Sequence, residues 1–477
     1  MLKTIGSSSD EDELERLIEI GNKWIKEKQG FLEFDFDDAK KQTGIFLNSI
    51  EQINIQGAEL LLGKIYDEIG FDQIEDKLLK ILVLSRLLYP ASKLKTLDRL
   101  LRYHSLEIDE HRIYRYLDKL YYQQKEKIQQ ISYLHTLKIL DNIISVVFYD
   151  VTTLYFQIDN EDEIRKRGFS KEGRHQNPQI VLGLLVSIGG YPLAFDIFEG
   201  NKFEGHTMLP VLDTFKEKYN LDKLVIVADS GLLSNQNISE LQNKGYEFIL
   251  GARIKNENQE IRDKILSLDL DNGESQIITK PDKLKLIITY SEKRAKKDRH
   301  NRERGLQRLE KQMRSGKLTK SNINNRGYNK YLKMEGNVKI SIDKDKFLAD
   351  AKWDGLKGYI SNTNLSKDQI IENYSHLWKI EKAFRISKHD LKIRPIYHRL
   401  QRRIEAHITI NFVAYKVYKE LERQLKEKGS NLSPEKIIDI VKTIYSVKVR
   451  IPNTNEYMTK TILLNDEQKS LAKLFNL

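Results

Sequence analysis

The pattern of hydrophobic and polar positions divides the chain into regions of different secondary structure. From residue 10 to 142, apolar residues recur at spacings of three and four, which predicts helices at 13–26, 58–69, 76–88, 93–103 and 111–122. From Ile143 the pattern changes to continuous apolar runs, 143–149 and 223–228, which are typical of central buried strands. Each of these runs ends on an aspartate, Asp150 and Asp229 respectively. The pattern therefore predicts an α/β core behind a helical N-terminal region.

Further strands and helices complete this core. Residues 180–198 read as two strands around a Gly189-Gly190 turn, and 246–252 as one more strand. Helices are expected at 207–218 and at 235–244, the second capped by Ser234.

A stretch near residue 380 predicts one long helix, from Ser366 to Pro395. Ser366 and Gln369 form a capping-box signature, and Pro395 cannot continue a helix. Tyr374, Glu381 and Lys388 are seven residues apart, so they lie nearly in line on one face. The apolar residues that flank Glu381 on this face are Leu377, Trp378 and Phe384. We therefore expect the Glu381 carboxylate to face the core.

A buried carboxylate is costly unless a cation meets it. An ion pair with Arg385, four residues further on, is one explanation for Glu381. A bound metal ion is the other, and the acids Asp150 and Asp229 at the ends of two predicted strands favour it. Taken singly, each of these aspartates is equally well explained as a cap of the turn that follows it.

Composition indicates the kind of partner. The chain has 477 residues, enough for roughly two to four domains, and a net charge of +11 with a pI near 9.2, which favours a polyanion such as nucleic acid. It has no cysteine, which excludes disulfides and Cys-ligated zinc or iron–sulfur sites. We see no secretory signal, and the most apolar region, 180–198, is too short and too interrupted to span a membrane. We expect a soluble, intracellular protein.

Basic residues gather in two places. Residues 293–333 contain fifteen Lys or Arg against three acids, and we expect this mostly helical segment to face phosphate groups rather than only solvent. The helices at 93–103 and 111–122 are basic and aromatic. They could grip DNA or equally form a helical bundle with a solvated charged face.

The order of elements predicts a ribonuclease H-like mixed sheet with flanking helices, a basic insertion and a helical N-terminal region. We divide the chain into a helical, DNA-binding region 1–142, the two parts of the core at 143–254 and 351–415, an α+β insertion 255–350, and a C-terminal helical region 416–477. In such a sheet two parallel strands lie side by side and a helix packs across them, which brings Asp150, Asp229 and Glu381 to one edge. Three carboxylates without His or Cys suit Mg²⁺ or Mn²⁺, and two such ions promote attack on a phosphodiester.

Together these residues resemble a known family, the bacterial insertion-sequence transposases of the DDE class, in the subgroup with a Y-x2-R-x3-E-x6-K motif. Tyr374, Glu381 and Lys388 match the motif, whereas Leu377 stands at its arginine position, where Lys379 or Arg385 could compensate. The resemblance covers roughly residues 55 to 415. Its other matching segments are F-Y-D-V-T-T around Asp150, G-F-S-K with N-P-Q-I-V-L-G-L-L-V, F-E-G-N, V-A-D-S-G-L-L-S around Asp229, I-R-P-I-Y-H and R-R-I-E-A-H-I.

The resemblance implies a cut-and-paste transposase of the bacterial cytoplasm and nucleoid. Such an enzyme binds terminal inverted repeats, acts as a dimer in a paired-end complex, and cleaves and joins DNA strands with Mg²⁺ or Mn²⁺, two ions being expected. By position, Asp150, Asp229 and Glu381 are the catalytic metal ligands. The residues expected to contact DNA are Tyr374, Lys388, Arg385, Lys379, Lys171 and Arg174.

Other functions fit the sequence less well. A haloacid-dehalogenase phosphatase requires a second aspartate where Thr152 stands, and a P-loop requires Lys and Ser or Thr where Arg174 and His175 stand. Two alternatives stay open: a DNA-binding relative that has lost catalysis, and a metal-dependent nuclease that cuts without joining strands.

Overall fold

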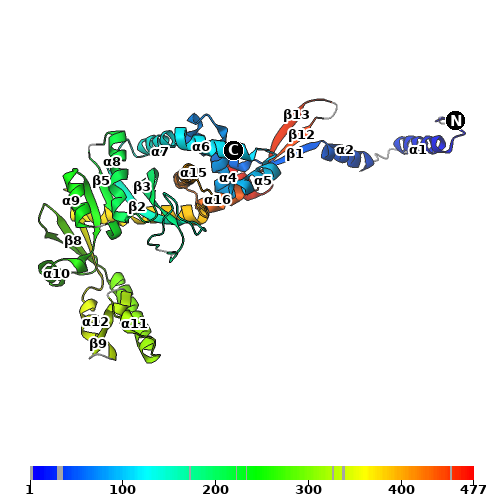
Figure 1. The fold of residues 1–477 in the computed structure, drawn as a ribbon. Coiled ribbons are helices and arrows are strands. Elements are labelled where there is room, and N and C mark those ends of the chain that lie inside the picture. The colour runs from blue at the N-terminus through cyan, green and yellow to red at the C-terminus, as the bar shows by residue number, and fades with distance from the viewer. Residues whose placement is uncertain are drawn as a thin grey trace.

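The protein has a body built on one large sheet, a smaller unit that projects from it, and an N-terminal arm (Figure 1). The arm carries α1 (Glu11–Lys28) and α2 (Phe36–Asn48), and the projecting unit carries α11 (Glu292–Arg314) and α12 (Lys344–Ala351). The computed structural model describes residues 4–29, 36–170, 173–221, 223–232, 234–324, 327–335, 339–451 and 454–477.

The large sheet has the strand order β4-β3-β2-β5-β6-β11-β8-β7. Strand β2 is antiparallel to β3 and parallel to β5, and β5 is parallel to β6, which is the ribonuclease H-like arrangement that the sequence predicts. The remaining strands extend the sheet in antiparallel fashion. The strands are β2 (Val146–Tyr155), β3 (Gln179–Ser187), β4 (Pro192–Glu199), β5 (Val225–Ala228), β6 (Glu247–Ala252), β7 (Ser275–Thr279), β8 (Lys285–Tyr290) and β11 (Leu356–Ser361).

Helices cover both faces of this sheet, which explains the continuous apolar runs of its central strands. Alternate residues of β2 point to opposite faces, so Val147 and Tyr149 pack on one side and Phe148 on the other. The first side is covered by α8 (Met208–Tyr219) and α9 (Asn235–Asn243), whose cap Ser234 is confirmed. The second side is covered by α4 (Lys77–Leu88), α13 (Lys367–Ser375), α14 (Trp378–Arg385) and α15 (Gln401–Glu427).

The N-terminal region is mostly helical, as predicted, with side-chain caps from Asp76, Ser92 and Asp109. Two π-helical turns interrupt it. Its elements are η1 (Glu59–Gly63), α3 (Lys64–Ile69), α4, α5 (Lys93–His104), α6 (Glu110–Lys119), η3 (Leu120–Gln124) and α7 (Lys125–Ile139).

A second sheet, which the local pattern did not indicate, joins a strand that follows the N-terminal arm to two strands near the C-terminus. Strand β1 (Ile50–Ile55) pairs with β12 (Tyr445–Arg450), which pairs with β13 (Tyr457–Ile462). Two C-terminal helices, α16 (Pro434–Val441) and α17 (Asp466–Phe475), complete this region. Since β1 finds its partner at the other end of the sequence, its pairing depends on tertiary contacts.

The segment between β6 and β11 divides into two parts. Strands β7 and β8, with α10 (Gln259–Leu266), join the large sheet. The projecting unit adds β9 (Leu332–Glu335) and β10 (Lys339–Ile342) to α11 and α12, around a small core of Leu309, Tyr331 and Leu332. None of the helices in the described part of the chain has the length and apolar character of a membrane-spanning segment.

The prediction of a single helix from Ser366 to Pro395 is wrong. The capping box of Ser366 and Gln369 is present, but α13 ends at Ser375, α14 begins at Trp378, and a π-helical turn, η9 (Ile386–Asp390), follows. The side chains of Asn373 and Ser375 donate hydrogen bonds to carbonyl groups of the preceding turn. Such bonds compete with the backbone hydrogen bonds of the helix at the point where the helix ends.

Candidate active site

Two of the predicted acids lie side by side at one edge of the sheet. Strands β2 and β5 pair in parallel with Tyr149 beside Ala228, so Asp150 and Asp229 each come one residue later. Neighbouring strands lie about 4.8 Å apart. The expectation that Asp150 ends its strand is wrong, because β3 continues to pair with β2 as far as Tyr155. Strand β5 does end at Ala228, so from Asp150 onward β2 has no strand paired with it on the β5 side.

The direction of Asp150 follows from the alternation along β2. Asp150 and Phe148 share a face, and that face packs against α14 and α15. Asp150 is half-buried, and its Oδ1 accepts a hydrogen bond of 2.7 Å from the backbone N–H of Val151. The Asp150 carboxylate is therefore on the side of the sheet that α14 crosses.

Asp229 is exposed and held by two donors. Its Oδ1 accepts a 2.7 Å bond from the backbone N–H of Ser230 and a longer 3.4 Å bond from the Tyr374 hydroxyl. Tyr374 is only 6% exposed, and burial, reinforced by the charge of Asp229, raises the pKa of its phenol. Tyr374 therefore keeps its proton and acts as a donor to Asp229.

A glycine makes this contact possible. A Cβ on Gly251 of β6 would lie 2.5 Å from the Tyr374 hydroxyl oxygen and 3.0 Å from the backbone nitrogen of Ser230. Any larger residue at Gly251 must displace one of these atoms. Gly251 therefore provides the space in which Tyr374 reaches Asp229.

Glu381 is exposed on α14, so the prediction that it faces the core is wrong. After the break before Trp378, the buried face of the helix consists of Ile380, Ala383 and Phe384. Trp378, expected to flank a buried Glu381, is itself 53% exposed. Arg385 is also exposed, and among the described residues no ion pair joins it to Glu381.

The sequence analysis missed a lysine, Lys357, that lies beside Tyr374. The Nζ of Lys357, on β11, is 4.5 Å from the centre of the Tyr374 ring and 5.1 Å from that of Tyr359. Burial and Arg294 lower the pKa of Lys357, whereas the charges of Asp229 and Glu381 act in the opposite direction. Lys357 therefore lies in the electrostatic field of both carboxylates. It belongs to no recognisable motif, and only the pairing of β11 brings it here.

Glu204 is a further acid near this edge. Its Oε2 and the Oδ2 of Asp229 lie 3.8 and 3.9 Å from the position that a Cβ on Gly231 would take. Glu204 follows the F-E-G-N segment that the sequence analysis singled out, but it carries no strand-end signal of its own. The two carboxylates thus flank the turn that follows β5.

The donor set at this edge suits a hard cation. Asp150, Asp229 and Glu381 offer only carboxylate oxygens, which Mg²⁺ and Mn²⁺ prefer. Asp229 and Glu381 are exposed and form no ion pair with a residue that the structure describes. Within the described ranges, no three His, Cys, Asp or Glu side chains form a ready-made metal site. The structure thus brings Asp150 and Asp229 together, whereas Glu381 is linked to Asp229 only in that the charges of both act on the pKa of Lys357 and of Tyr374.

The predicted DNA-contacting residues near Glu381 are in different environments. Arg385 is exposed and Lys388, in η9, is half-buried. Lys379 donates a 2.6 Å hydrogen bond to the carbonyl of Ile188, at the turn between β3 and β4. In this structure Lys379 therefore joins α14 to that turn.

Two arginine side chains lie over the ring of Tyr155, the last residue of β2. The guanidinium groups of Arg174 and Arg394 are 5.5 and 5.0 Å from the centre of the Tyr155 ring. Arg174 is exposed, and Arg394, which the sequence analysis did not select, is half-buried. Lys171, also expected to contact DNA, lies outside the described residues.

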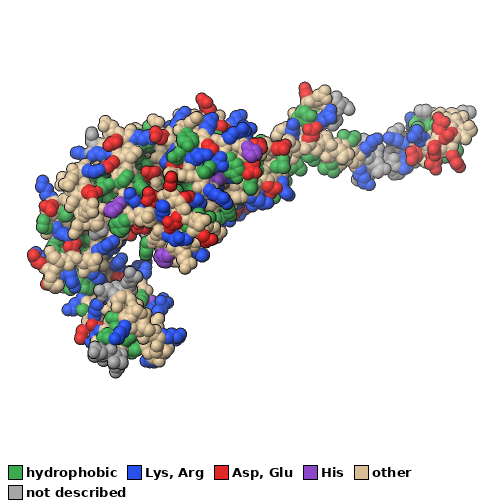
Figure 2. All heavy atoms as spheres, in the orientation of Figure 1, with side chains coloured by type: hydrophobic (Ala, Val, Ile, Leu, Met, Phe, Trp, Pro, Cys, Tyr) green, Lys and Arg blue, Asp and Glu red, His purple; other side chains and the backbone are tan. Residues whose placement is uncertain are grey.

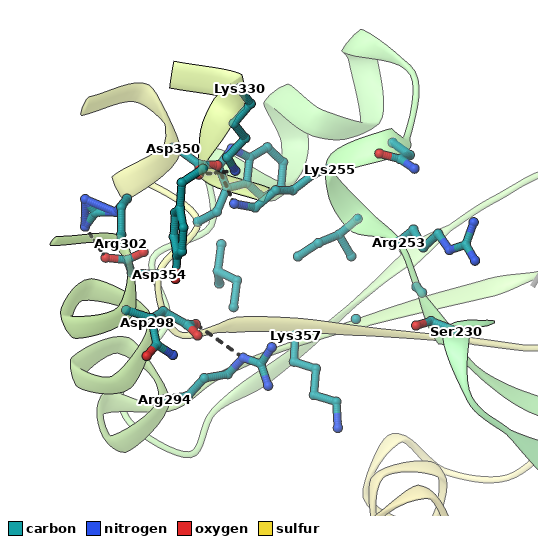
Figure 3. A pocket seen from close by; sticks show the side chains of 18 of the residues that line it. Ser230, Arg253, Lys255, Arg294, Asp298, Arg302, Lys330, Asp350, Asp354 and Lys357 are labelled. Atoms are coloured by element: carbon teal, nitrogen blue, oxygen red, sulfur yellow. Dashed lines mark hydrogen bonds and ion pairs between the residues drawn. The ribbon is translucent and has the colours of Figure 1, made fainter. Parts of the chain in front are cut away.

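A cavity of about 470 Å³ opens beside Ser230, between the sheet and the projecting unit. Three carboxylates in it are matched by cations, and Figure 3 shows the pairs Arg294–Asp298 and Lys255–Asp350. Arg294 and Lys357 both line this cavity, and the charge of Arg294 lowers the pKa of Lys357. The cationic residues that line the cavity are Arg253, Lys255, Arg294, Arg302, Lys330 and Lys357. With six cations against three acids, the cavity favours an anionic occupant.

Comparisons with known proteins identify the family. A model of the transposase DDE domain matches residues 142–416, which is more than half of the chain. None of the curated proteins matches the sequence.

Two solved structures show a distant similarity. One is a piggyBac transposase synaptic complex with hairpin DNA, 10% identical, covering 81% of this chain and 76% of that chain with a TM-score of 0.41. The other is a Mos1 transposase paired-end complex with the left transposon end, 12% identical, covering 38% of this chain and 57% of that chain with a TM-score of 0.17. The segment that the family model matches begins just before β2, ends within α15 and includes Asp150, Asp229 and Glu381, and the chain belongs to the transposase DDE domain family.

Proposed function

We propose that this protein is a cut-and-paste DNA transposase of a bacterial insertion sequence, in which Asp150, Asp229 and Glu381 form the catalytic site. The observation that carries the proposal is the parallel register of β2 and β5, which puts Asp150 beside Asp229 on the face that α14 crosses. The motif Tyr374-x6-Glu381-x6-Lys388 supports the assignment to that subgroup.

The three carboxylates would hold Mg²⁺ or Mn²⁺, two ions being expected, which activate a water or 3′-hydroxyl and stabilise the leaving 3′-oxygen. Two side chains of the protein, Tyr374 and Lys357, would position groups at this edge. Tyr374 donates to Asp229 and so restricts the carboxylate to one orientation. Lys357, whose pKa responds to the charges of both Asp229 and Glu381, would supply a positive charge to a phosphate oxygen that enters this edge.

The DNA substrate is supported by the charge distribution. The chain is basic overall, α11 is rich in Lys and Arg, and the cavity beside Ser230 is lined mainly by cations. Figure 2 shows Lys and Arg side chains over both the body and the projecting unit on this face. We propose that these surfaces bind terminal inverted repeats and target DNA, with Lys388, Arg385 and Arg174 on phosphates. Two copies would act together in a paired-end complex in the bacterial cytoplasm, on nucleoid DNA.

We also propose that the working units follow the predicted division of the chain. The two core segments, 143–254 and 351–415, carry the catalytic edge, and 255–350 provides basic surface beside it. Beyond the arm, helices of 1–142 and of 416–477 pack against α15 and against one another.

The proposal is tested by three isosteric variants, Asp150→Asn, Asp229→Asn and Glu381→Gln. Each should reduce Mg²⁺-dependent cleavage of end-containing DNA by more than about a hundredfold, because each removes an anionic ligand. DNA binding in a gel-shift assay should stay close to that of the unaltered protein. The matched control is Glu372→Gln, which neutralises an exposed acid on α13 and should leave cleavage unchanged.

The assay also separates the alternatives. Unaltered cleavage by any of the three variants refutes the assignment of that residue. Binding by the unaltered protein without cleavage, in either Mg²⁺ or Mn²⁺, supports a relative that has lost catalysis. Cleavage that is never followed by strand transfer supports a nuclease.

A further inference from the structure

Four basic side chains from α4, α5, α15 and the segment that joins η9 to α15 are buried in one cluster. They are Arg86 of α4, Lys93 at the first position of α5, His398 of the joining segment and His407 of α15, which are 5%, 7%, 9% and 4% exposed. The ring centres of His398 and His407 are 5.7 Å apart. Burial first, and then the charges of Lys93 and Arg86 among others, lower the pKa of both histidines. The cluster therefore concentrates positive charge inside the protein.

The two histidines belong to segments that have no role in the proposed catalytic site. His398 ends I-R-P-I-Y-H, and His407 stands in R-R-I-E-A-H-I, both of which the sequence analysis singled out. The Nη1 of Arg86 donates to the carbonyl of Lys392 at 3.2 Å, and the Nε2 of His407 donates to the carbonyl of Ile393 at 2.8 Å. These bonds hold the joining segment against α4 and α15. They neutralise no charge, because each acceptor is an uncharged carbonyl.

Within the described part of the chain, no acidic side chain pairs with Arg86 or Lys93. The ammonium group of Lys93 also forms no hydrogen bond with a residue that the structure describes. Burial, followed by the charge of Arg86, lowers the pKa of Lys93. Arg403, whose charge also acts on His398, is already paired with Asp118 at 2.9 Å. The two buried cations of the cluster are thus left without a balancing acid.

Other buried cations of this protein do have partners. Lys416 donates a 3.0 Å bond to the carbonyl of Ser132, and Arg302, 8% exposed, pairs with Asp354 at 2.5 Å. Buried charges cost free energy unless they are paired and hydrogen-bonded. An anion bound from outside would remove this cost in the cluster and would give Lys93 an acceptor.

We propose that Arg86, Lys93, His398 and His407 form a binding site for one phosphate group, at the end of the body from which the arm leaves (Figure 1). Lys93 and protonated His398 donate hydrogen bonds to the phosphate oxygens, and Arg86 adds a second fixed positive charge. A phosphate group fits because it accepts several hydrogen bonds and carries up to two negative charges. Its source is either free inorganic phosphate or the backbone of DNA. The site shares no residue with the proposed catalytic edge.

Thermal unfolding of the full chain tests the site with inorganic phosphate as the probe. At roughly 10 mM, phosphate should raise the unfolding midpoint of the unaltered protein by about 2 °C or more relative to chloride of equal ionic strength, since it binds only the folded state. Lys93→Met should lose this shift. In chloride this variant should unfold at the same or a higher temperature than the unaltered protein, because it removes a buried unpaired charge. The matched control is Lys95→Met, which removes an exposed lysine of α5 that pairs with Asp98 and should keep the shift.

His398 should take up a proton when the anion binds, because the pKa of about 4 that burial and the neighbouring cations give it applies to the empty site. Sulfate keeps two negative charges at neutral pH, so it is the probe for this step. Its stabilising effect should grow as the pH falls from about 8 to about 6, and His398→Gln should remove this growth. An equal pH dependence of the two proteins overturns the role of His398. The charged and titratable groups that act on or contact His398 are Arg86 of α4, Lys93 of α5, Tyr114 of α6, and Arg403 and His407 of α15.

Gel-shift assays with duplex DNA identify the source of the phosphate group. If the DNA backbone supplies it, Lys93→Met should lower the slope of log affinity against log salt concentration by about one. If both proteins bind DNA with the same salt dependence and only the unaltered protein gains from inorganic phosphate, the source is free phosphate. The proposal is overturned if Lys93→Met matches the unaltered protein both in its response to phosphate and in the salt dependence of DNA binding. Because neither measurement involves cleavage, that result would leave the catalytic assignment unaffected.

Discussion

Helices α14 and α15 are joined by the ion pair of Lys382 and Glu422, 2.5 Å apart, yet their carboxylates are in opposite situations. On α15, Glu405 pairs with Lys125 at 2.7 Å, and Glu420 pairs with Arg423 at 2.6 Å. On α14, Glu381 is exposed and forms no ion pair with a described residue.

The difference separates carboxylates that the fold pairs with its own cations from Glu381, which we propose as a metal ligand. A buried carboxylate needs a cation and hydrogen bonds from its own protein. Glu405 receives its cation from Lys125 of α7, and Glu420 receives its own from Arg423 of α15. Even Lys416 of α15, which is fully buried, donates a 3.0 Å bond to the carbonyl of Ser132, and burial lowers the pKa of its amine. At the proposed catalytic edge, the balancing charge is expected from outside the chain. Burial alone therefore does not mark a functional acid in this protein.

The largest expected effect is on the free energy of unfolding, which should respond differently to substitution of Glu420 and of Glu381. Glu420→Ala should lower the free energy of unfolding by about 3 kcal/mol, because it leaves buried partners unpaired, whereas Glu381→Ala should change it by less than about 0.5 kcal/mol. Urea denaturation of both variants measures this. Equal losses of stability would show that the two carboxylates do not differ as described.

His398 lies in the segment between η9 and α15. This histidine should make the free energy of unfolding depend on pH. Burial, together with Lys93, Arg403 and Arg86, lowers the pKa of His398 to about 4. The unfolded chain binds a proton at this histidine below about pH 6.5, but the folded protein does not until about pH 4. Stability should therefore fall by up to about 3 kcal/mol as the pH drops from 6.5 to 4.

His398→Gln is the matching variant for this prediction. It should flatten the loss of stability between pH 6.5 and 4 relative to the unaltered protein, as measured by thermal unfolding at several pH values. Buried His407, whose pKa is also lowered by burial, should leave a residual slope of the same sign. An unchanged slope would contradict the assignment to His398.

The smallest expected effect comes from filling the space at Gly251, where Tyr374 reaches Asp229. Gly251→Ala should lower the free energy of unfolding by about 1–2 kcal/mol, because the new methyl group meets the Tyr374 hydroxyl. It should also reduce cleavage by displacing Tyr374 from Asp229. For stability the control is Gly231→Ala, where nothing approaches the new Cβ closer than 3.8 Å. Thermal unfolding and cleavage assays of both variants check this, and equal destabilisation would count against the contact.

Local sequence pattern was sufficient for much of the core. The apolar runs before Asp150 and Asp229 form adjacent parallel strands, and the caps at Ser234 and Ser366 are present as expected. These features follow from residues close together in the sequence: a buried strand needs a continuous apolar run, and a cap needs one polar side chain at a helix end.

What the sequence alone determined is the order of the core strands β2 to β6 and of the helices α8 and α9 between them, and the position of Asp229 directly after its strand. Tertiary packing decided the exposure of Glu381, the pairing of β1 with β12 and the position of Lys357 beside Tyr374. The physical reason is that these features depend on contacts between residues far apart in the chain. A helix face is buried only where a partner covers it, and that partner cannot be read from the helix itself.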